Sequence, residues 1–306
     1  MRNIEIQHIF KKKQWDDLPT ALLFLLPSII LFAAFNFYPM VAAIRLSFYK
    51  WDNLSVAPVF SGFANYIKLF SDIRFWISLR VTFGYTIGVT AISIALGLVL
   101  AVILNHRWLF LRSFWRTLYF LPAVTPTVAA AMVWILLFNP NFGYVNTFLD
   151  YFHIQEQTWL SNVNLALPTL MSLGIWRRLG FTVIMYLAAL QAIPQEYYES
   201  ARVDGANARQ IFSHVTVPLV APTTLMLVTL GLIDSFLVFD QVLVMTRGGP
   251  ADATLVIGVY LYTSAFSFFK MSYGAAISVV ALIIIATITI LQWRFVGFGA
   301  SEMEVV

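Results

Sequence analysis

The sequence lacks cysteine and contains few charged residues. Of its 306 residues, 11% are Asp, Glu, Lys or Arg, whereas a soluble domain carries about 25%. The lack of cysteine excludes disulfides, thiolate nucleophiles and cysteine-ligated zinc or iron–sulfur sites. The low charge leaves too little polar surface to cover a chain that is 60% hydrophobic. Together these absences predict an integral membrane protein.

Sequence motifs for catalysis and metal binding are also absent. No G-x-x-x-x-G-K-[ST] phosphate loop occurs, and the four histidines form neither an H-E-x-x-H motif nor a close pair. We find no arrangement of a nucleophile and a base. We therefore expect no catalytic residue, no metal ligand and no cofactor in this chain, which is not expected to be an enzyme. If the protein moves any solute uphill, the energy must come from a partner.

Long uncharged runs dominate the sequence. A helix of roughly 20 residues crosses the hydrocarbon core of a membrane, and unpaired backbone in lipid is costly enough to require helices. The sequence predicts an all-α polytopic membrane protein with six transmembrane helices at 18–43, 81–104, 117–138, 166–190, 212–244 and 272–296. The uncharged stretch 253–269 is short for a span, so an interfacial or re-entrant helix is favoured there over a seventh span.

The distribution of positive charge predicts the orientation of these spans. Ten Lys and Arg residues flank them on the side of both termini, and seven flank them on the other side. Lys and Arg are enriched in cytoplasmic loops, so we expect both termini in the cytoplasm. The expected organisation is a cytoplasmic segment 1–17, a six-helix transmembrane domain 18–296 and a cytoplasmic tail 297–306.

The stretch 195–212 is polar, although it lies between two apolar runs. Pro194 can begin a helix, Glu196 and Glu199 suit the positive end of the helix dipole, and Gly205 permits a bend. The sequence therefore predicts a cytoplasmic helix at 195–212. On physical grounds alone, an ordinary connecting loop with a surface helix is the simpler interpretation.

A family resemblance changes that interpretation. The pattern Glu199-Ser200-Ala201, three residues, Gly205, nine residues, Val215-x-Val217-Pro218 resembles the "EAA" signature of permease subunits of bacterial ATP-driven importers. Ser200, Val215 and Val217 are mild departures from the Ala, Ile and Leu of that signature. Segments from "LFLLPSIILFAAFNFYPM" to "MSYGAAISVV" resemble the carbohydrate-uptake branch, similar to maltose and glycerol-3-phosphate permeases. The resemblance implies the type I importer (MetI-like) fold in a bacterial inner membrane.

In that family the EAA helix docks on an ATP-hydrolysing subunit, and the resemblance implies the same contact here. The residues expected at this contact are Glu199, Ser200, Ala201, Asp204, Gly205, Ala206, Phe212 and Pro218. The partners implied are a second homologous permease, two ATPase subunits that bind ATP and Mg, and an extracytoplasmic solute-binding protein. The "TRGGP" turn at 246–250 would contact the binding protein.

Ionisable residues inside membrane spans are costly and therefore indicate function. Arg177 and Arg178 lie in the fourth predicted span and Asp234 lies in the fifth, on helix faces that the resemblance places beside a central substrate cavity. The expected pathway residues are Gly174, Arg177, Arg178, Phe181, Gly231, Asp234, Ser235, Val238 and Asp240. Asp240 ranks lower, because in a continuous helix it does not share the face of Asp234. A structural pair of Arg178 with Asp234 is an alternative, and both roles can hold together.

The resemblance implies translocation of a sugar or sugar-like solute by alternating access. An alternative is glycerol-3-phosphate or a related polyol derivative, since two arginines can hold a phosphate. A more distant alternative is a secondary transporter or channel without an ATPase, and a membrane enzyme would need a reactive group that the sequence does not show.

Overall fold

The computed structural model describes residues 18–51, 57–106 and 111–301. The longer helices are α2 (Leu18–Phe32), α3 (Tyr38–Ser47), α5 (Ile73–Asn105), α6 (Arg112–Val124), α7 (Thr127–Leu137), α9 (Ala166–Ala192), α13 (Ala221–Phe236) and α16 (Met271–Ser301). The short helices are α4 (Ala64–Phe70), α8 (Tyr144–Tyr151), α10 (Gln195–Val203), α11 (Ala208–Ile211), α12 (Val217–Leu219), α14 (Asp240–Met245) and α15 (Ile257–Tyr262). Three π-helical turns are η1 (Ala33–Phe37), η2 (Phe212–Thr216) and η3 (Thr263–Ser267), and the strands β1 (Tyr49–Lys50) and β2 (Val59–Phe60) pair antiparallel. The helical architecture confirms the predicted fold class, whereas the predicted segment 1–17 and the last residues of the tail, 302–306, lie outside the described residues.

Five stretches of the described chain are long and apolar enough to cross a membrane. They are Leu22–Ser47, Ile73–Asn105, Ala166–Ala192, Ala221–Met245 and Met271–Arg294. A sixth span exists only if α6 and α7 count together, and these two helices meet at a bend of 99°. The prediction of one helix over 117–138 is therefore wrong. Pro126 explains the bend, because a residue before proline avoids the helical region, and Thr125 is extended with φ −76° and ψ 130°.

The fifth predicted span, 212–244, is not one continuous helix either. It begins with η2 and α12, α13 ends at Phe236, and α14 begins only at Asp240. The short helix α15 packs against this break, since a Cβ on Gly258 would lie 2.9 Å from the carbonyl oxygen of Val238. Within the segment 253–269, α15 and η3 are too short to be counted as a span, and Val259 and Tyr260 are buried in the core. The predicted interfacial or re-entrant position of this segment stays a prediction.

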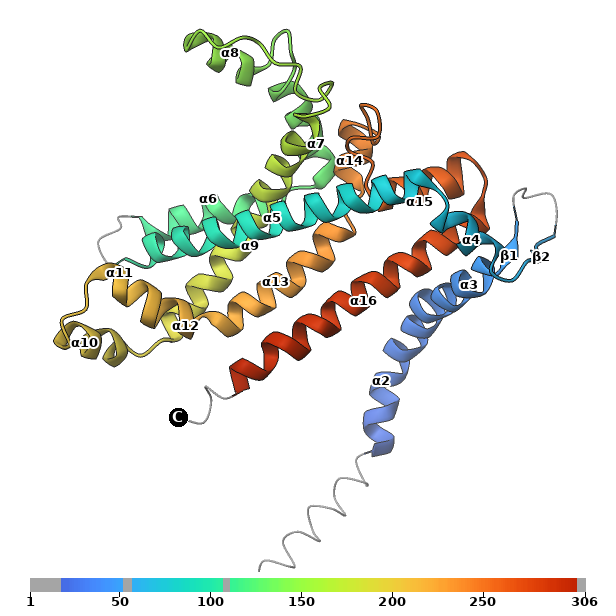
Figure 1. The fold of residues 1–306 in the computed structure, drawn as a ribbon. Helices are drawn as coiled ribbons and strands as arrows, with labels where there is room; N and C mark the ends of the chain where they lie inside the picture. Colours follow the sequence, from blue (N-terminus) through green and yellow to red (C-terminus); the bar gives the residue numbers. More distant parts are fainter. Residues whose placement is uncertain (1–17, 52–56, 107–110, 302–306) are drawn as a thin grey trace, which may run out of the picture.

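The centre of the bundle is formed by α5, α9 and α13. Helix α5 packs along α9 and α13, α6 packs on α9, and α16 contacts α13 and α3 (Figure 1). Glycines allow the closest approaches, as is common between membrane helices. Gly97 of α5 faces Thr182 of α9, and Gly180 of α9 faces the backbone of Tyr119 in α6.

The bundle has two distinct ends (Figure 1). We name the end that carries α10, α11 and α12 the α10 end, and the end that carries α4 and α15 the α15 end. At the α15 end, Asp72 accepts hydrogen bonds from the hydroxyls of Tyr260 and Tyr273. Burial alone raises the pKa of the Asp72 carboxyl, but these hydrogen bonds, together with the backbone N–H and the charge of Arg74, outweigh burial, and the net pKa lies below its usual value.

A bidentate ion pair extends this network at the α15 end. Arg74 donates from Nε and Nη2 to the two carboxylate oxygens of Asp252, over 2.9 and 2.8 Å. The loop after α14, which contains the "TRGGP" turn, is thereby held against the start of α5.

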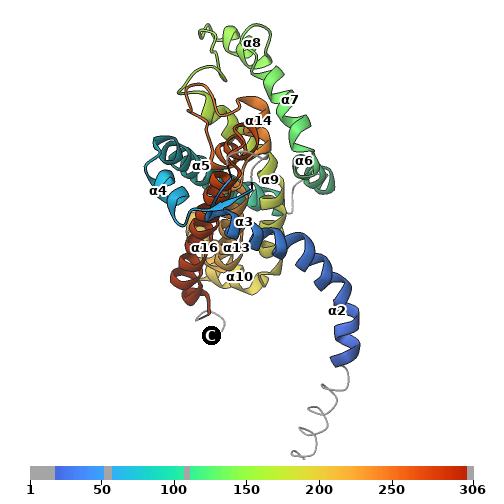
Figure 2. The ribbon, with the colours of Figure 1, turned by 90° about the vertical axis from the view of Figure 1, so that its right-hand side faces the viewer.

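Helix α2 extends away from this bundle (Figures 1 and 2). Its large apolar side chains from Leu22 to Phe32 are exposed, and no residue in the most apolar part of the stretch Leu22–Ser47 is buried. Only the following helix, α3, packs against α16. An apolar surface of this extent requires lipid or another protein to cover it.

We expect Gly180→Ala to destabilise the protein, because the added Cβ would overlap the carbonyl oxygen of Tyr119 and push α6 away from α9. Overpacking of this kind costs about 1–3 kcal/mol. The matched control is Gly84→Ala in α5, where the nearest atom, Cδ2 of Leu167, would lie at 4.0 Å. Thermal unfolding in detergent measures both variants, and an equal midpoint for Gly180→Ala and Gly84→Ala would contradict the packing described here.

Candidate functional site

The chain reverses direction at the α10 end through two capping motifs. Gly205 has φ +79°, the N–H of Ala206 donates to the carbonyl of Ala201, and the N–H of Gly205 donates to that of Arg202. These two bonds form the Schellman motif that ends α10. Asn207 then forms a capping box with Gln210 and begins α11. The prediction of one helix over 195–212 is therefore wrong, because "DGAN" ends one helix and begins the next.

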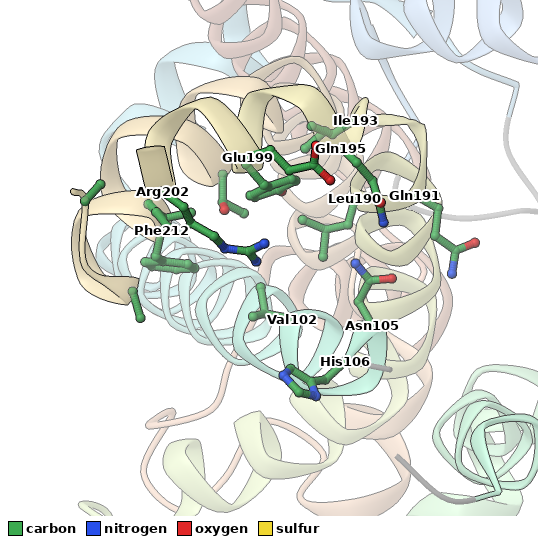
Figure 3. Close-up of a pocket in the computed structure, with 15 residues that line it drawn as sticks. Val102, Asn105, His106, Leu190, Gln191, Ile193, Gln195, Glu199, Arg202 and Phe212 are labelled. Carbon is green, nitrogen blue, oxygen red and sulfur yellow. The ribbon is translucent and has the colours of Figure 1, made fainter. Parts of the chain in front are cut away.

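A groove of about 960 Å³ lies between this helical pair and the rest of the α10 end. Its walls come from the ends of α5 and α9 and from α10, α11 and η2. Figure 3 shows Arg202 reaching into the groove from α10, with Asn105 and His106 on the opposite wall. Glu199 lies on the α10 wall beside Gln195. The lining mixes these polar side chains with apolar ones such as Val102, Leu190 and Phe212.

The predicted coupling residues divide into two groups. Glu199, Ala206 and Phe212 line the groove. The others lie outside its lining: Ser200, Ala201, Asp204, Gly205 and Pro218. Ala201, Gly205 and Phe212 do not share one helical face, since α10 ends at Val203.

The outer surface of α10 carries exposed apolar side chains. Val203 is 87% exposed and Tyr197 is 53% exposed, and both belong to α10, which lies at one tip of the bundle (Figure 1). Apolar groups on an otherwise polar surface indicate a protein contact. This surface and the groove together make the α10 end a candidate docking site.

A second hollow, of about 520 Å³, lies between α9, α13, α14 and the α6–α7 bend. We name it the cavity. Eight of the nine predicted pathway residues line it, and they come from α9, from α13 and from the residues that follow α13: Gly174, Arg177, Arg178, Phe181, Asp234, Ser235, Val238 and Asp240. The sequence therefore located this lining correctly, and the transport role of these residues stays a prediction.

The ninth residue, Gly231, lies behind the cavity and makes room for Arg178. A Cβ on Gly231 would lie 2.9 Å from Nη2 of Arg178 and 2.6 Å from Cγ2 of Thr90. Arg178 donates from Nη2 to the carbonyl of Leu227 at 3.0 Å and pairs through Nη1 with Asp234 at 3.2 Å. The side chain of Arg178 is 9% exposed and that of Asp234 is 75% exposed. The structural pair predicted as an alternative is present, at the wall of the cavity.

The break after α13 explains why Asp240 faces the same cavity as Asp234. A continuous helix would separate these two carboxylates, but residues 237–239 leave the helix and redirect the chain. Gln241 fixes the first turn of α14, where the chain becomes helical again. Its buried amide donates to the hydroxyl of Tyr85 and, at 3.4 Å, to the carbonyl of Leu170. The lower rank given to Asp240 assumed a continuous helix, which the structure does not show, and the role of Asp240 in transport stays a prediction.

Several lining residues were not predicted as site residues. In the cavity they include Tyr85, Phe120, Thr127, Phe239 and Gln241. In the groove they include Asn105, His106, Gln191, Gln195 and Arg202. The polar pair Asn105-His106 at the end of a long apolar run is a signal that the sequence offered. The cavity residues from α5, α6 and α7 become visible only through tertiary packing.

Comparison with known proteins identifies a family. Residues 93–296 match the family described as binding-protein-dependent transport system inner membrane component. The chain is 37% identical over 291 residues to the inner membrane ABC transporter permease protein YcjO of Escherichia coli strain K12, covering 94% of this chain and 97% of YcjO. It is 30% identical over 299 residues to the arabinooligosaccharides transport system permease protein AraP of Bacillus subtilis strain 168, covering 95% of each.

A solved structure agrees with these sequence matches. The fold is similar to that of a chain of a bacterial ABC transporter involved in the import of the acidic polysaccharide alginate, with a TM-score of 0.77 and 26% identity. The similarity covers 94% of this chain and 99% of that chain. The resemblance to sugar permeases is confirmed.

We expect Asp234→Ala to destabilise the protein, because it leaves the buried guanidinium of Arg178 without its carboxylate. Breaking a fully buried pair costs about 3–5 kcal/mol, and the exposure of Asp234 reduces the expected loss to about 1–2 kcal/mol. The double variant Arg178→Met with Asp234→Ala removes the unpaired charge. It should restore most of the midpoint temperature of thermal unfolding that Asp234→Ala loses. A double variant less stable than Asp234→Ala alone would contradict the pairing.

Proposed function

This chain belongs to the family of binding-protein-dependent transport system inner membrane components, and from this membership we propose that it transports a sugar or an oligosaccharide. As an ABC transporter permease it is a multi-pass subunit of the inner membrane. The observation that carries the proposal is that the family match includes most of the groove and the cavity in one stretch, 93–296.

The sugar assignment is supported by the relatives and by the cavity. AraP is named for arabinooligosaccharides and the similar structure for alginate, so these relatives favour a sugar over glycerol-3-phosphate. The cavity combines carboxylates and arginines with Tyr85, Phe120, Phe181 and Phe239. Hydroxyls of a sugar need such donors and acceptors, and aromatic rings can stack on its apolar face.

The proposed assembly contains a second, homologous permease, two ATPase subunits and a solute-binding protein. The exposed length of α2 supports a second membrane subunit, because one more apolar partner would cover it. Tyr197 and Val203 on α10 support an ATPase contact at the α10 end. ATP and Mg would bind to the ATPase subunits, and this chain would hold no cofactor and catalyse no reaction.

In the proposed orientation both termini and the α10 end face the cytoplasm, and the α15 end faces the binding protein. ATP binding would close the ATPase subunits and move the α10–α11 pair. The groove around Glu199 and Arg202 would transmit this movement to the ends of α5 and α9, so that the cavity opens alternately to each side. Hydrolysis would then reset the transporter.

Reconstitution in liposomes tests this function. We expect sugar uptake only when this chain is combined with its partner permease, the ATPase subunits, the loaded binding protein and ATP. The readout is accumulation of labelled sugar inside the liposomes. Uptake by this chain alone would instead support a secondary transporter or channel, and turnover of a solute by the isolated chain would support an enzyme.

We expect Gly205→Val to weaken retention of the ATPase subunits by about 5–30-fold in affinity. Gly205 has φ +79° with no atom within 4 Å of an added Cβ, so the substitution acts through the backbone, where a left-handed conformation costs about 1–2 kcal/mol. Gly205→Asn should retain the ATPase, because Asn adopts positive φ more readily. Co-purification from detergent and ATPase activity give the measurement.

The control for this prediction is Gly62→Val. Gly62 also has positive φ, at +58°, with open space around it, but it lies near β2 at the α15 end. The Gly62→Val variant should have the same backbone strain, but the ATPase subunits should still co-purify with it. Equal loss of the ATPase in Gly62→Val and Gly205→Val would show that general destabilisation, and not docking at the α10 end, causes the effect.

A further inference from the structure

Two neighbouring arginines of α9 line the cavity, and they differ in their partners. Arg178 uses both Nη atoms, one for Asp234 and one for the carbonyl of Leu227. In the part of the chain that the structure describes, no group accepts a hydrogen bond from Arg177, and its Nε is buried. The Nε of Arg178 is also unpartnered, but the charge of Arg178 is matched by a carboxylate.

The formal charges around the cavity sum to zero, so the sum does not show whether any charge is unpaired. Each charged side chain has to be matched with its own partner. Arg177 and Arg178 are balanced in number by Asp234 and Asp240. Asp234 is engaged by Arg178. Asp240 is exposed at the first turn of α14, where water and the helix dipole stabilise a carboxylate. Arg177 is partly buried, and among the described residues no carboxylate forms an ion pair with it and no group accepts a hydrogen bond from its Nε. The cavity therefore retains one unpaired cation.

A partly buried arginine without an acceptor is best satisfied by an anion with two oxygens. The guanidinium presents a planar set of donors that matches a carboxylate in a bidentate geometry. In a cavity that is also lined by Ser235 and aromatic rings, such an anion would belong to the solute itself.

We propose that Arg177 binds a carboxylate of the transported solute, which makes that solute an acidic oligosaccharide, such as one containing uronic acids. This inference rests on the proposed function and specifies its substrate class. The adjacent Arg178 belongs to the wall of the cavity and holds α9 against α13, whereas Arg177 selects the charge of the solute. Asp234 and Asp240 accept hydrogen bonds from sugar hydroxyls on the same solute.

The test uses the complete transporter in nanodiscs with two probes of equal length, a trimer of galacturonic acid and a neutral trimer of galactose. Equilibrium binding is measured by calorimetry for the wild type, Arg177→Gln and Arg177→Lys. The expected result is a preference for the acidic trimer of about tenfold or more, as for a hydrogen bond to a charged group. Arg177→Gln should remove this preference without changing the affinity for the neutral trimer, and Arg177→Lys should keep part of it.

Salt provides a second readout that a purely structural role would not change. Affinity for the acidic trimer should fall between 50 and 300 mM salt in the wild type and not in Arg177→Gln, since screening weakens an accessible ion pair. Arg178→Gln is the comparison variant on the neighbouring residue, and it should lower the unfolding midpoint, because it removes the bonds to Asp234 and to the carbonyl of Leu227.

The following outcomes would overturn the proposal. Equal binding of both trimers by the wild type, or an equal loss of both in Arg177→Gln, would show that Arg177 does not select charge. Loss of the second permease from Arg177→Gln would assign Arg177 to the subunit interface. Binding of the neutral trimer alone leaves the sugar importer intact, whereas a transporter that binds neither trimer and shows no sugar-stimulated ATPase activity contradicts the proposed function as well.

Discussion

A buried guanidinium joins two of the helices that line the cavity. Arg178 joins α9 to α13 through a carbonyl and a carboxylate, and Gly231 supplies the space for it. Inside a membrane such a charge is tolerated only where the protein satisfies it. The same pair brings Asp234 to the wall of the cavity, where three quarters of its side chain is exposed. One ion pair thus stabilises the bundle and gives the cavity an acceptor.

The positions of the spans could be predicted from the sequence because uncharged length is enough to detect a helix in lipid. The bend in the third predicted span and the break in the fifth could not be predicted in this way. The turn at Thr125 and Pro126 was signalled locally by the proline, but its angle of 99° follows from packing of α7 against α14. The break at 237–239 contains neither glycine nor proline. It depends on the amide of Gln241 and on the close approach of Gly258, which are contacts distant in sequence.

The candidate site was predicted well where charge in an apolar run was the signal, and less well where local turns decide the geometry. Arg177, Arg178 and Asp234 were found because charges in apolar runs stand out, and the structure places all three at the cavity. The segment 195–212 was recognised as polar and helical, but the Schellman motif at Gly205 and the capping box at Asn207 divide it. The residues of both motifs lie in the stretch "DGANARQ". The sequence analysis predicted a bend at Gly205 and did not predict that one helix ends there and another begins.

Helix α5 connects all of these regions without interruption. Its 33 residues form a rod of about 50 Å that starts beside Asp72, passes the cavity at Tyr85 and Val89, and ends in the groove at Asn105. A rod without a break cannot absorb displacement along its length. Pivoting it by about 5° at one end would shift the other by about 4 Å over that length. Acting as a lever, this helix would convert a rotation of a few degrees at the α10 end into a displacement of several ångströms at the α15 end.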